Sequence, residues 1–84
     1  MLATIPTEKI YDAREVPCSI KHGQILSRAQ ALALEDFFVL INGHNPVPLK
    51  YQLNAEHPGQ FSWDYLQEGP DAFAVRIGRI KQAV

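Results

Sequence analysis

Apolar residues follow strand-like patterns in three stretches of the chain. Residues 37–41 are five consecutive apolar residues, which is typical of a strand that is central in its sheet or covered on both faces, and we expect this strand to span residues 36–42. Residues 60–66 and 72–80 alternate along the chain as strands with one buried face do. Turn-forming residues separate these two strands, so the sequence predicts a hairpin.

A helix is predicted between residues 18 and 33. Its apolar residues recur at spacings of three and four, which places them on one face: Ile25, Leu26, Ala29, Leu32 and Ala33. Pro17 marks the start of this helix, because proline is tolerated before or at the first helical position. His22 precedes the first apolar residues by three and four positions, so we expect it at the buried edge of that face.

A second helix is predicted after the strand at 36–42. Its signals follow one another in order: an N-cap at Asn45, prolines tolerated in the first turn at Pro46 and Pro48, and inward-facing leucines at Leu49 and Leu53. His57 stands before a proline and resists helical geometry, so the helix should end there.

The predicted elements give a single α/β domain. A short strand at 10–16 precedes the first helix, so the order is βαβαββ. The simplest closed arrangement is an α+β two-layer sandwich, with two helices on one face of a four-stranded mixed sheet. We expect residues 1–9 to be a loose lead-in and residues 10–84 to form the domain.

Composition narrows the classes of function. Eight basic and nine acidic residues among 84 give a net charge of −1, whereas domains that bind nucleic acid carry a basic excess. A single cysteine excludes an internal disulfide and fits a reducing compartment. Neither a signal peptide nor the roughly 18–20 apolar residues of a membrane-spanning helix are visible. We therefore expect a cytoplasmic protein, monomeric or weakly dimeric, that binds neither nucleic acid nor membranes.

Cys18 is the first candidate for chemistry. A thiol at the N-terminus of a helix lies at the positive end of the helix dipole, which favours the thiolate, and Lys21 and His22 add positive charge in the first turn. Such a thiol suits a nucleophile, a sulfur carrier that holds a persulfide, or a ligand for a soft metal. The alternative is that Cys18 is a small buried hydrophobic residue, as many free cysteines are.

The histidines suggest a metal site as a second possibility. Cys18 and His22 are four residues apart and face the same direction, and such a pair ligates a transition metal or acts as thiol and base. His44 would be the third ligand, because the carboxyl ends of strands meet at one edge of a sheet. Alternatively, His22 is a hydrogen-bonded histidine at the edge of the core, and His44 is a loop residue whose side chain bonds to its own backbone. His57 is expected to be exposed.

The remaining candidates are binding residues. Asp12 and Arg14 are expected to pair with each other or with the loop backbone near Cys18. The aromatic residues of 61–65 alternate as core residues of a strand do, and no basic residues are interleaved with them as base stacking would require. The predicted binding set is Asp12, Arg14, His44, Asn45 and Trp63.

Several motifs resemble known families. Asp12, Arg14 and Cys18 match the spacing of the TusA-like (SirA-like) sulfur carriers, which open with Asp-x-Arg-x-x-x-Cys-Pro-x-Pro. A closer resemblance, to the family called domain of unknown function 2249, covers residues 10–80. It implies the βαβαββ sandwich of the TusA-like fold and an association with redox, nitrogen-oxide or hemerythrin-type iron proteins, without an established activity. We expect the partner of this chain to be another protein in sulfur or redox metabolism. Its motifs stand at residues 17–22, 42–49, 51–52, 61–63 and 69–70.

The chain departs from both patterns at the candidate site. The carriers' Cys-Pro-x-Pro is Cys18-Ser19-Ile20-Lys21 here, without the prolines that stiffen the entry to the helix. Members of the family usually carry acidic residues beside the loop histidine, where this chain has Gly43 and Asn45. The resemblance to the carriers therefore does not by itself imply persulfide transfer by this chain. The resemblance to the family likewise does not imply a metal site that needs those carboxylates.

Three functions follow from these residues. The first is a small carrier or binding protein that relays sulfur or another thiol-linked group through Cys18, assisted by Lys21 or His22. The second is a metal- or cofactor-linked accessory module that uses Cys18, His22 and His44. The third is a protein-interaction domain without chemistry of its own. The bound group would be a transition metal or a cysteine persulfide, and because no catalytic set is complete we do not expect a stand-alone enzyme.

Overall fold

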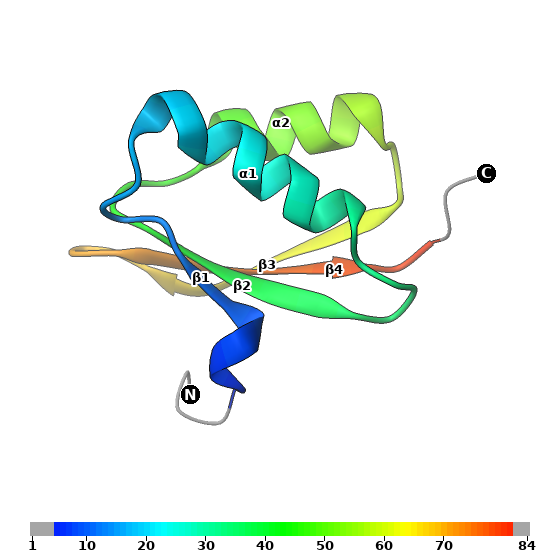
Figure 1. Ribbon diagram of the computed structural model, residues 1–84, viewed down its shortest axis with the longest axis horizontal. Helices are drawn as coiled ribbons and strands as arrows, with labels where there is room; N and C mark the ends of the chain where they lie inside the picture. Colours follow the sequence, from blue (N-terminus) through cyan, green and yellow to red (C-terminus); the bar gives the residue numbers. More distant parts are fainter. Residues whose placement is uncertain (1–4, 82–84) are drawn as a thin grey trace.

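The computed structural model describes residues 5–81 (Figure 1). After a short 3-10 helix, η2 (Thr7–Lys9), two helices and four strands follow one another in the predicted order. Their bounds are β1 (Ile10–Asp12), α1 (Cys18–Gln30), β2 (Phe37–Asn42), α2 (Val47–Glu56), β3 (Phe61–Glu68) and β4 (Phe73–Arg79). Within residues 5–81, neither helix has the length and apolar character needed to cross a membrane.

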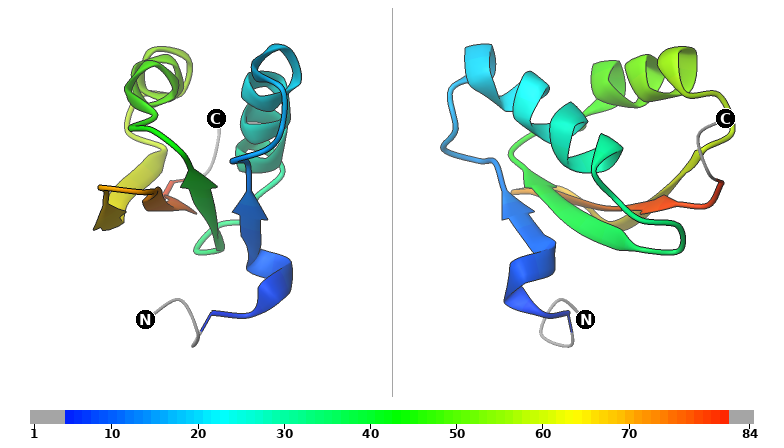
Figure 2. Two further views of the ribbon diagram at one scale, coloured as in Figure 1. Left: turned by 90° about the vertical axis from the view of Figure 1, so that its left-hand side faces the viewer. Right: turned by 45° about the vertical axis from the view of Figure 1, so that its right-hand side comes forward.

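The four strands form one mixed sheet in the order β1-β2-β4-β3. β1 pairs in parallel with β2, and β4 pairs antiparallel with both β2 and β3. Figure 2 shows both helices on the same face of this sheet. The predicted two-layer α+β sandwich, with its hairpin of β3 and β4, is therefore confirmed.

The core lies between the helices and one face of the sheet. Alternate residues of β2 and β4 are buried there: Phe38, Leu40, Val75 and Ile77. The helices contribute Ile25, Ala29, Leu49 and Leu53. Three partly buried aromatic residues of β3 pack against the same cluster, so the prediction that the alternation in 61–65 serves the core is confirmed.

β1 is shorter than the strand predicted at 10–16. It ends at Asp12, because the Asp12 side chain accepts a hydrogen bond from the backbone N–H of Arg14, and the N–H of Val16 donates to the carbonyl of Ala13. These two bonds form a turn, and the chain leaves the sheet before it reaches Pro17.

α1 also ends earlier than predicted, at Gln30 rather than Ala33. Leu32 still packs against the core, whereas Ala33 is exposed. The side chain of Arg79 donates a hydrogen bond to the carbonyl of Gln30, one of the carbonyls that a helix C-terminus leaves free. Glu35 then adopts a positive φ of 69° where the chain turns into β2.

The segment before β1 is tied to the start of β2. Residues 1–4, which belong to the predicted lead-in, and residues 82–84 lie outside the described residues. From Thr7 the chain forms η2, and the ammonium group of Lys9 pairs with the carboxylate of Asp36. The same carboxylate accepts the backbone N–H of Phe37 at 2.8 Å. The last part of the predicted lead-in, Thr7–Lys9, therefore contacts the sheet at the start of β2.

Both helices begin at the same end of the molecule. β1 and β2 run parallel, so their carboxyl ends lead into α1 and α2 on the left side of Figure 1. The loops at 13–17 and 43–46 therefore lie at this end, as predicted for strand ends that meet at one edge.

Candidate functional site

Cys18 is the first residue of α1 and is exposed to solvent. The carbonyl of Pro17, at the N-cap, accepts the backbone N–H groups of Ile20 and Lys21 at 3.0 and 2.9 Å. The thiol therefore lies at the positive end of a helix of 13 residues. The alternative that Cys18 is a buried hydrophobic residue is wrong.

Asn42 connects α1 to the loop that follows β2. It is the last residue of β2, and it is only 2% exposed. Its Oδ1 accepts a hydrogen bond from Nζ of Lys21 at 2.8 Å, and its Nδ2 donates to the carbonyl of His44 at 3.1 Å. Breaking either bond would leave a buried polar atom unsatisfied. Asn42 therefore positions both Lys21 and the His44 loop.

His22 is held by polar side chains of α2. Its Nε2 contacts Oε1 of Gln52, and Nε2 of Gln52 donates to Oε2 of Glu56 at 2.9 Å. Gln52 and Glu56 are four residues apart and lie on one face of α2. His22 is half-buried, as its predicted place at the edge of the apolar face requires. The structure thus gives one of its ring nitrogens a hydrogen-bond partner.

These elements enclose a cavity of about 120 Å³. Four candidate residues from the sequence line it together: Cys18, Lys21, His22 and His44. The rest of the lining consists of Ile25, Asn42, Pro46, Pro48 and Leu49. Among these described residues none carries a carboxylate, so the cavity presents a thiol, an ammonium group and two imidazoles on largely apolar walls. A surface of this kind favours a small anionic or electrophilic group.

A family model covers all of these elements. The model described as "Uncharacterized conserved protein (DUF2249)" matches residues 10–79. The chain belongs to this family. Comparison with the curated proteins and with the solved structures found no match. The DUF2249 match includes every residue that lines the cavity, so the cavity lies wholly within the matched region.

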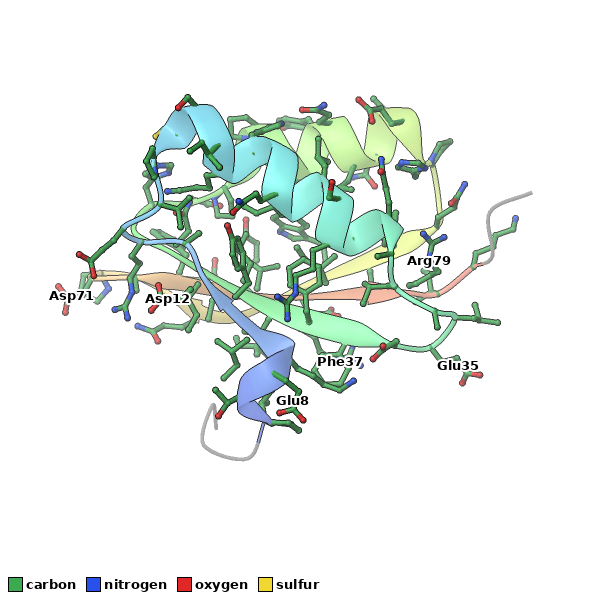
Figure 3. The ribbon with its side chains drawn as sticks, in the orientation of Figure 1. Glu8, Asp12, Glu35, Phe37, Asp71 and Arg79 are labelled. Carbon is green, nitrogen blue, oxygen red and sulfur yellow. The ribbon has the colours of Figure 1, made fainter. Side chains whose placement is uncertain are left out.

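Asp12 and Arg14 of this DUF2249 chain pair with each other, one of the two predicted arrangements. Oδ1 of Asp12 accepts Nε of Arg14 at 2.9 Å, and Oδ2 accepts Nη2 at 2.6 Å. These hydrogen bonds are the main reason that the pKa of Asp12 lies below its ordinary value of 3.8. Figure 3 labels Asp12 at the end of the molecule where both helices begin, but neither residue lines the cavity. The pair stabilises the turn after β1.

Asn45 does not cap α2, and the prediction that it does is wrong. α2 begins at Val47 with Pro46 at the N-cap. The N–H of Val47 already donates to the backbone carbonyl of Asn45, and Pro48 has no N–H for a cap to bind. The side-chain Oδ1 of Asn45 instead accepts the hydroxyl of Tyr65 at 2.6 Å. Asn45 thus joins the loop to β3 and lies outside the cavity lining.

Trp63 and His57 also lie outside the cavity lining. Trp63 packs against the core from β3, and within residues 5–81 its buried Nε1 has no hydrogen-bond partner. His57, predicted to be exposed, is half-buried instead, because its ring packs edge-on against Phe61 with the centroids 5.6 Å apart. Its Nε2 lies 3.3 Å from Nε2 of Gln30.

The predicted metal ligands share the cavity without forming a ligand group. Over residues 5–81, no group of three or more His, Cys, Asp or Glu side chains is arranged to hold a metal ion. Cys18, His22 and His44 each line the cavity wall, and His22 is engaged with Gln52.

Two residues that shape the site, Asn42 and Gln52, lie in the family motifs at 42–49 and 51–52, but sequence reasoning did not assign them a place in the site. A polar side chain that ends a run of apolar strand residues is a signal for Asn42, because it must find partners when buried. For Gln52, the signal is its spacing of four residues from Glu56. Both signals are weak alone, since each acquires its meaning from a partner in another element.

Proposed function

We propose that this chain is a small carrier protein that holds a sulfane sulfur, or another small thiol-linked group, on Cys18 and passes it on without turnover of its own. The observation that carries the proposal is the position of Cys18. It is exposed at the start of α1 and lines the same cavity as Lys21, His22 and His44. The thiol is open to a donor, and the group that it carries has a cavity beside it.

The transfer step requires a nucleophilic thiolate and a donor perthiol, RS–SH. The Cys18 thiolate attacks the outer sulfur, so that a new S–S bond to Cys18 forms and the S–S bond of the donor breaks. The donor leaves as RS⁻ and takes up the proton that Cys18 released. No oxidant is needed, because the sulfane sulfur only changes its bonding partner. The positive charge of Lys21 favours the anionic sulfur in this step.

Two exposed apolar side chains support a protein partner. Ile20 is 49% exposed and Tyr51 is 69% exposed, and both lie within the first two turns of helices that begin at the cavity end (Figure 1). A partner in sulfur or redox metabolism that covers Ile20 would contact the same first turn of α1 that carries Cys18. The same observation supports the alternative of an interaction domain without chemistry. Either function suits the reducing cytoplasm, because the chain has one cysteine.

A metal- or cofactor-linked module for redox or nitrogen-oxide metabolism has weaker support. Cys18, His22 and His44 share the cavity, but they form no ligand group among the described residues. Retention of one transition-metal ion per chain after anaerobic purification, lost in a His44→Gln variant, would favour this alternative over the carrier.

Persulfide loading followed by intact-mass spectrometry tests the carrier proposal. The reduced protein is mixed without oxygen with a low-molecular-weight perthiol. We expect the mass of one sulfur atom to be added at Cys18, to be lost on reduction, and to pass to an acceptor thiol. Normal transfer by a Cys18→Ser variant would contradict the proposal.

A relocated thiol separates the effect of the cavity from the reactivity of any exposed cysteine. In the double variant Cys18→Ser/Ser27→Cys, the single thiol stays exposed on α1 but does not line the cavity. We expect this thiol to load more slowly and to lose its sulfur several-fold faster than Cys18. Equal loading and equal lifetime at the two positions would overturn the carrier role and favour the interaction domain.

A further inference from the structure

The hydrogen bonds around His22 determine which of its ring nitrogens carries the proton. The carboxylate of Glu56 only accepts hydrogen bonds, so the amide of Gln52 must turn its NH₂ group toward it, and that bond measures 2.9 Å. The amide oxygen of Gln52 then faces the imidazole and contacts Nε2 of His22. This oxygen has no hydrogen to donate, so the hydrogen of the contact must belong to Nε2.

We infer that Glu56 and Gln52 fix neutral His22 in the Nε2–H tautomer, so that Nδ1 presents its lone pair as a proton acceptor at the Cys18 cavity. In a neutral imidazole one nitrogen donates and the other accepts, and the partner of one nitrogen sets the state of the other. His22 itself lines the cavity, whereas Gln52 and Glu56 do not. These two residues of α2 are therefore positioning residues, which act through the ring.

The chain of hydrogen bonds leads from solvent to the cavity. Glu56 is exposed on α2, Gln52 and His22 are half-buried, and of these three residues only His22 lines the cavity. Gln52 and Glu56 share a face of one helix, so the bond that sets the direction of the Gln52 amide lies within α2 and does not involve α1. The ring of His22 is thus oriented by the packing of the two helices against each other.

The role of this tautomer at Cys18 rests on the proposed function. When Cys18 carries a perthiol, Cys18–S–SH, Nδ1 takes the proton of an acceptor thiol, and the resulting thiolate attacks the outer sulfur. A new S–S bond forms on the acceptor, the S–S bond to Cys18 breaks, and the Cys18 thiolate that leaves takes up the proton from the imidazolium. No electrons are gained or lost. The sulfane sulfur only changes its bonding partner, and Lys21 supplies a positive charge that favours the leaving Cys18 thiolate at the same cavity.

Nitrogen NMR of the full chain with isotope-labelled histidine tests the tautomer directly. The three rings are assigned with single His→Gln variants, and the spectra are recorded where the rings are neutral. We expect His22 to show a protonated Nε2 and an unprotonated Nδ1. Wild-type protein in which Nδ1 of His22 carries the hydrogen would overturn the inference.

Substitutions in α2 then test the cause. In Gln52→Lys the side chain that faces the ring can only donate a hydrogen bond, so we expect the share of the Nδ1–H tautomer to rise several-fold. Glu56→Ala should raise this share less, because it only leaves the amide of Gln52 free to turn. Gln30→Lys is the matched control, since Gln30 contacts His57 at the other end of the helix pair. An unchanged ratio at His22 in both α2 variants would overturn the inference. Gln52→Leu serves as the second variant if Gln52→Lys does not fold.

Sulfur transfer by the same variants tests the role at Cys18. We expect Gln52→Lys to load sulfur from the donor but to deliver it several-fold more slowly, whereas Gln30→Lys should deliver at the wild-type rate. Delivery at the wild-type rate by Gln52→Lys, despite its altered tautomer, would overturn the role of Nδ1. The NMR measurement is repeated in Cys18→Ser, because the tautomer of His22 can be read without the thiol. A failure of the carrier proposal is therefore distinguished from a failure of the tautomer inference.

Discussion

Arg79, the last residue of β4, donates a hydrogen bond from Nη2 to the backbone carbonyl of Gln30 at 3.0 Å, across 49 residues of chain. Gln30 ends α1, so the guanidinium lies at the negative end of the helix dipole. Arg79 is only 6% exposed, and its guanidinium lies 4.7 Å from the ring centroid of Phe61. Figure 3 shows Arg79 at the end of the molecule opposite Asp12, far from the end where both helices begin.

Replacing Arg79 by alanine should lower the free energy of unfolding by about 2–3 kcal/mol. A hydrogen bond to a charged group contributes roughly 1.5–3 kcal/mol, and this substitution leaves the carbonyl of Gln30 without its partner. Urea unfolding measures the change. Arg76→Ala is the matched control, because Arg76 lies on the other face of the same strand over the ring of Phe37. The control should lose no more than about 1 kcal/mol, and equal losses in the two variants would contradict the bridging role of Arg79.

The fold was predictable because it follows from patterns local to each element. The alternation in 61–65 and 72–80 identified two strands with one buried face, and the apolar run at 37–41 identified a strand in the middle of the sheet. The element ends were less predictable. β1 stops at Asp12 because of a side-chain bond to the backbone, which the apolar pattern does not report.

The candidate site was predictable only in part. The parallel strands bring Cys18, His22 and His44 to one cavity, as the rule for strand ends implies, while their chemical roles stay predictions. The residues that hold them in place depend on partners far away in the chain. Asn42 bonds Lys21 across 21 residues, and Gln52 contacts His22 across 30. No local pattern specifies such pairs, because they form only when the helices pack on the sheet.

The pair formed by Lys21 and Asn42 should contribute to stability as well as to the site. Lys21→Met leaves the buried Oδ1 of Asn42 without a donor, and an unsatisfied buried acceptor costs about 1–3 kcal/mol. Asn42→Leu removes the acceptor as well, so the double variant should lose less than the sum of the two single losses. A double-mutant cycle from urea unfolding measures this coupling. Strictly additive losses would mean that the two side chains do not stabilise each other.

Acid should destabilise the protein through two aspartates. The pKa of Asp36 is lowered chiefly by the hydrogen bond from Lys9, and that of Asp12 chiefly by the hydrogen bonds from Arg14. A carboxyl group whose pKa is lower in the folded state than in the unfolded chain stabilises the fold. This contribution is complete at pH values above the pKa of the unfolded chain, here near 3.8, and it is lost as the pH falls through the folded pKa.

The free energy of unfolding should therefore fall as the pH drops below about 4, and it should do so less steeply in high salt, because both pairs are partly exposed. The double variant Asp12→Asn/Asp36→Asn should show a flatter acid limb than the wild type. Urea unfolding at a series of pH values gives the comparison. Parallel pH profiles for the two proteins would show that other carboxyl groups control the acid limb.

The charge of Lys21 should make Cys18 selective for anionic reagents. Because the described cavity lining contains no carboxylate, Lys21 attracts an anion toward the thiol, and this attraction weakens as salt screens it. We expect the ratio of the alkylation rates with iodoacetate and iodoacetamide to fall several-fold in Lys21→Gln, and to fall in wild-type protein at high ionic strength. Lys50→Gln is the matched control, since Lys50 lies on α2 and does not line the cavity. Using the ratio cancels any change in the intrinsic reactivity of the thiol. If the ratio is the same in wild type, Lys21→Gln and Lys50→Gln, the cavity does not attract anions, and the part of the carrier proposal that assigns Lys21 to the anionic sulfur is wrong.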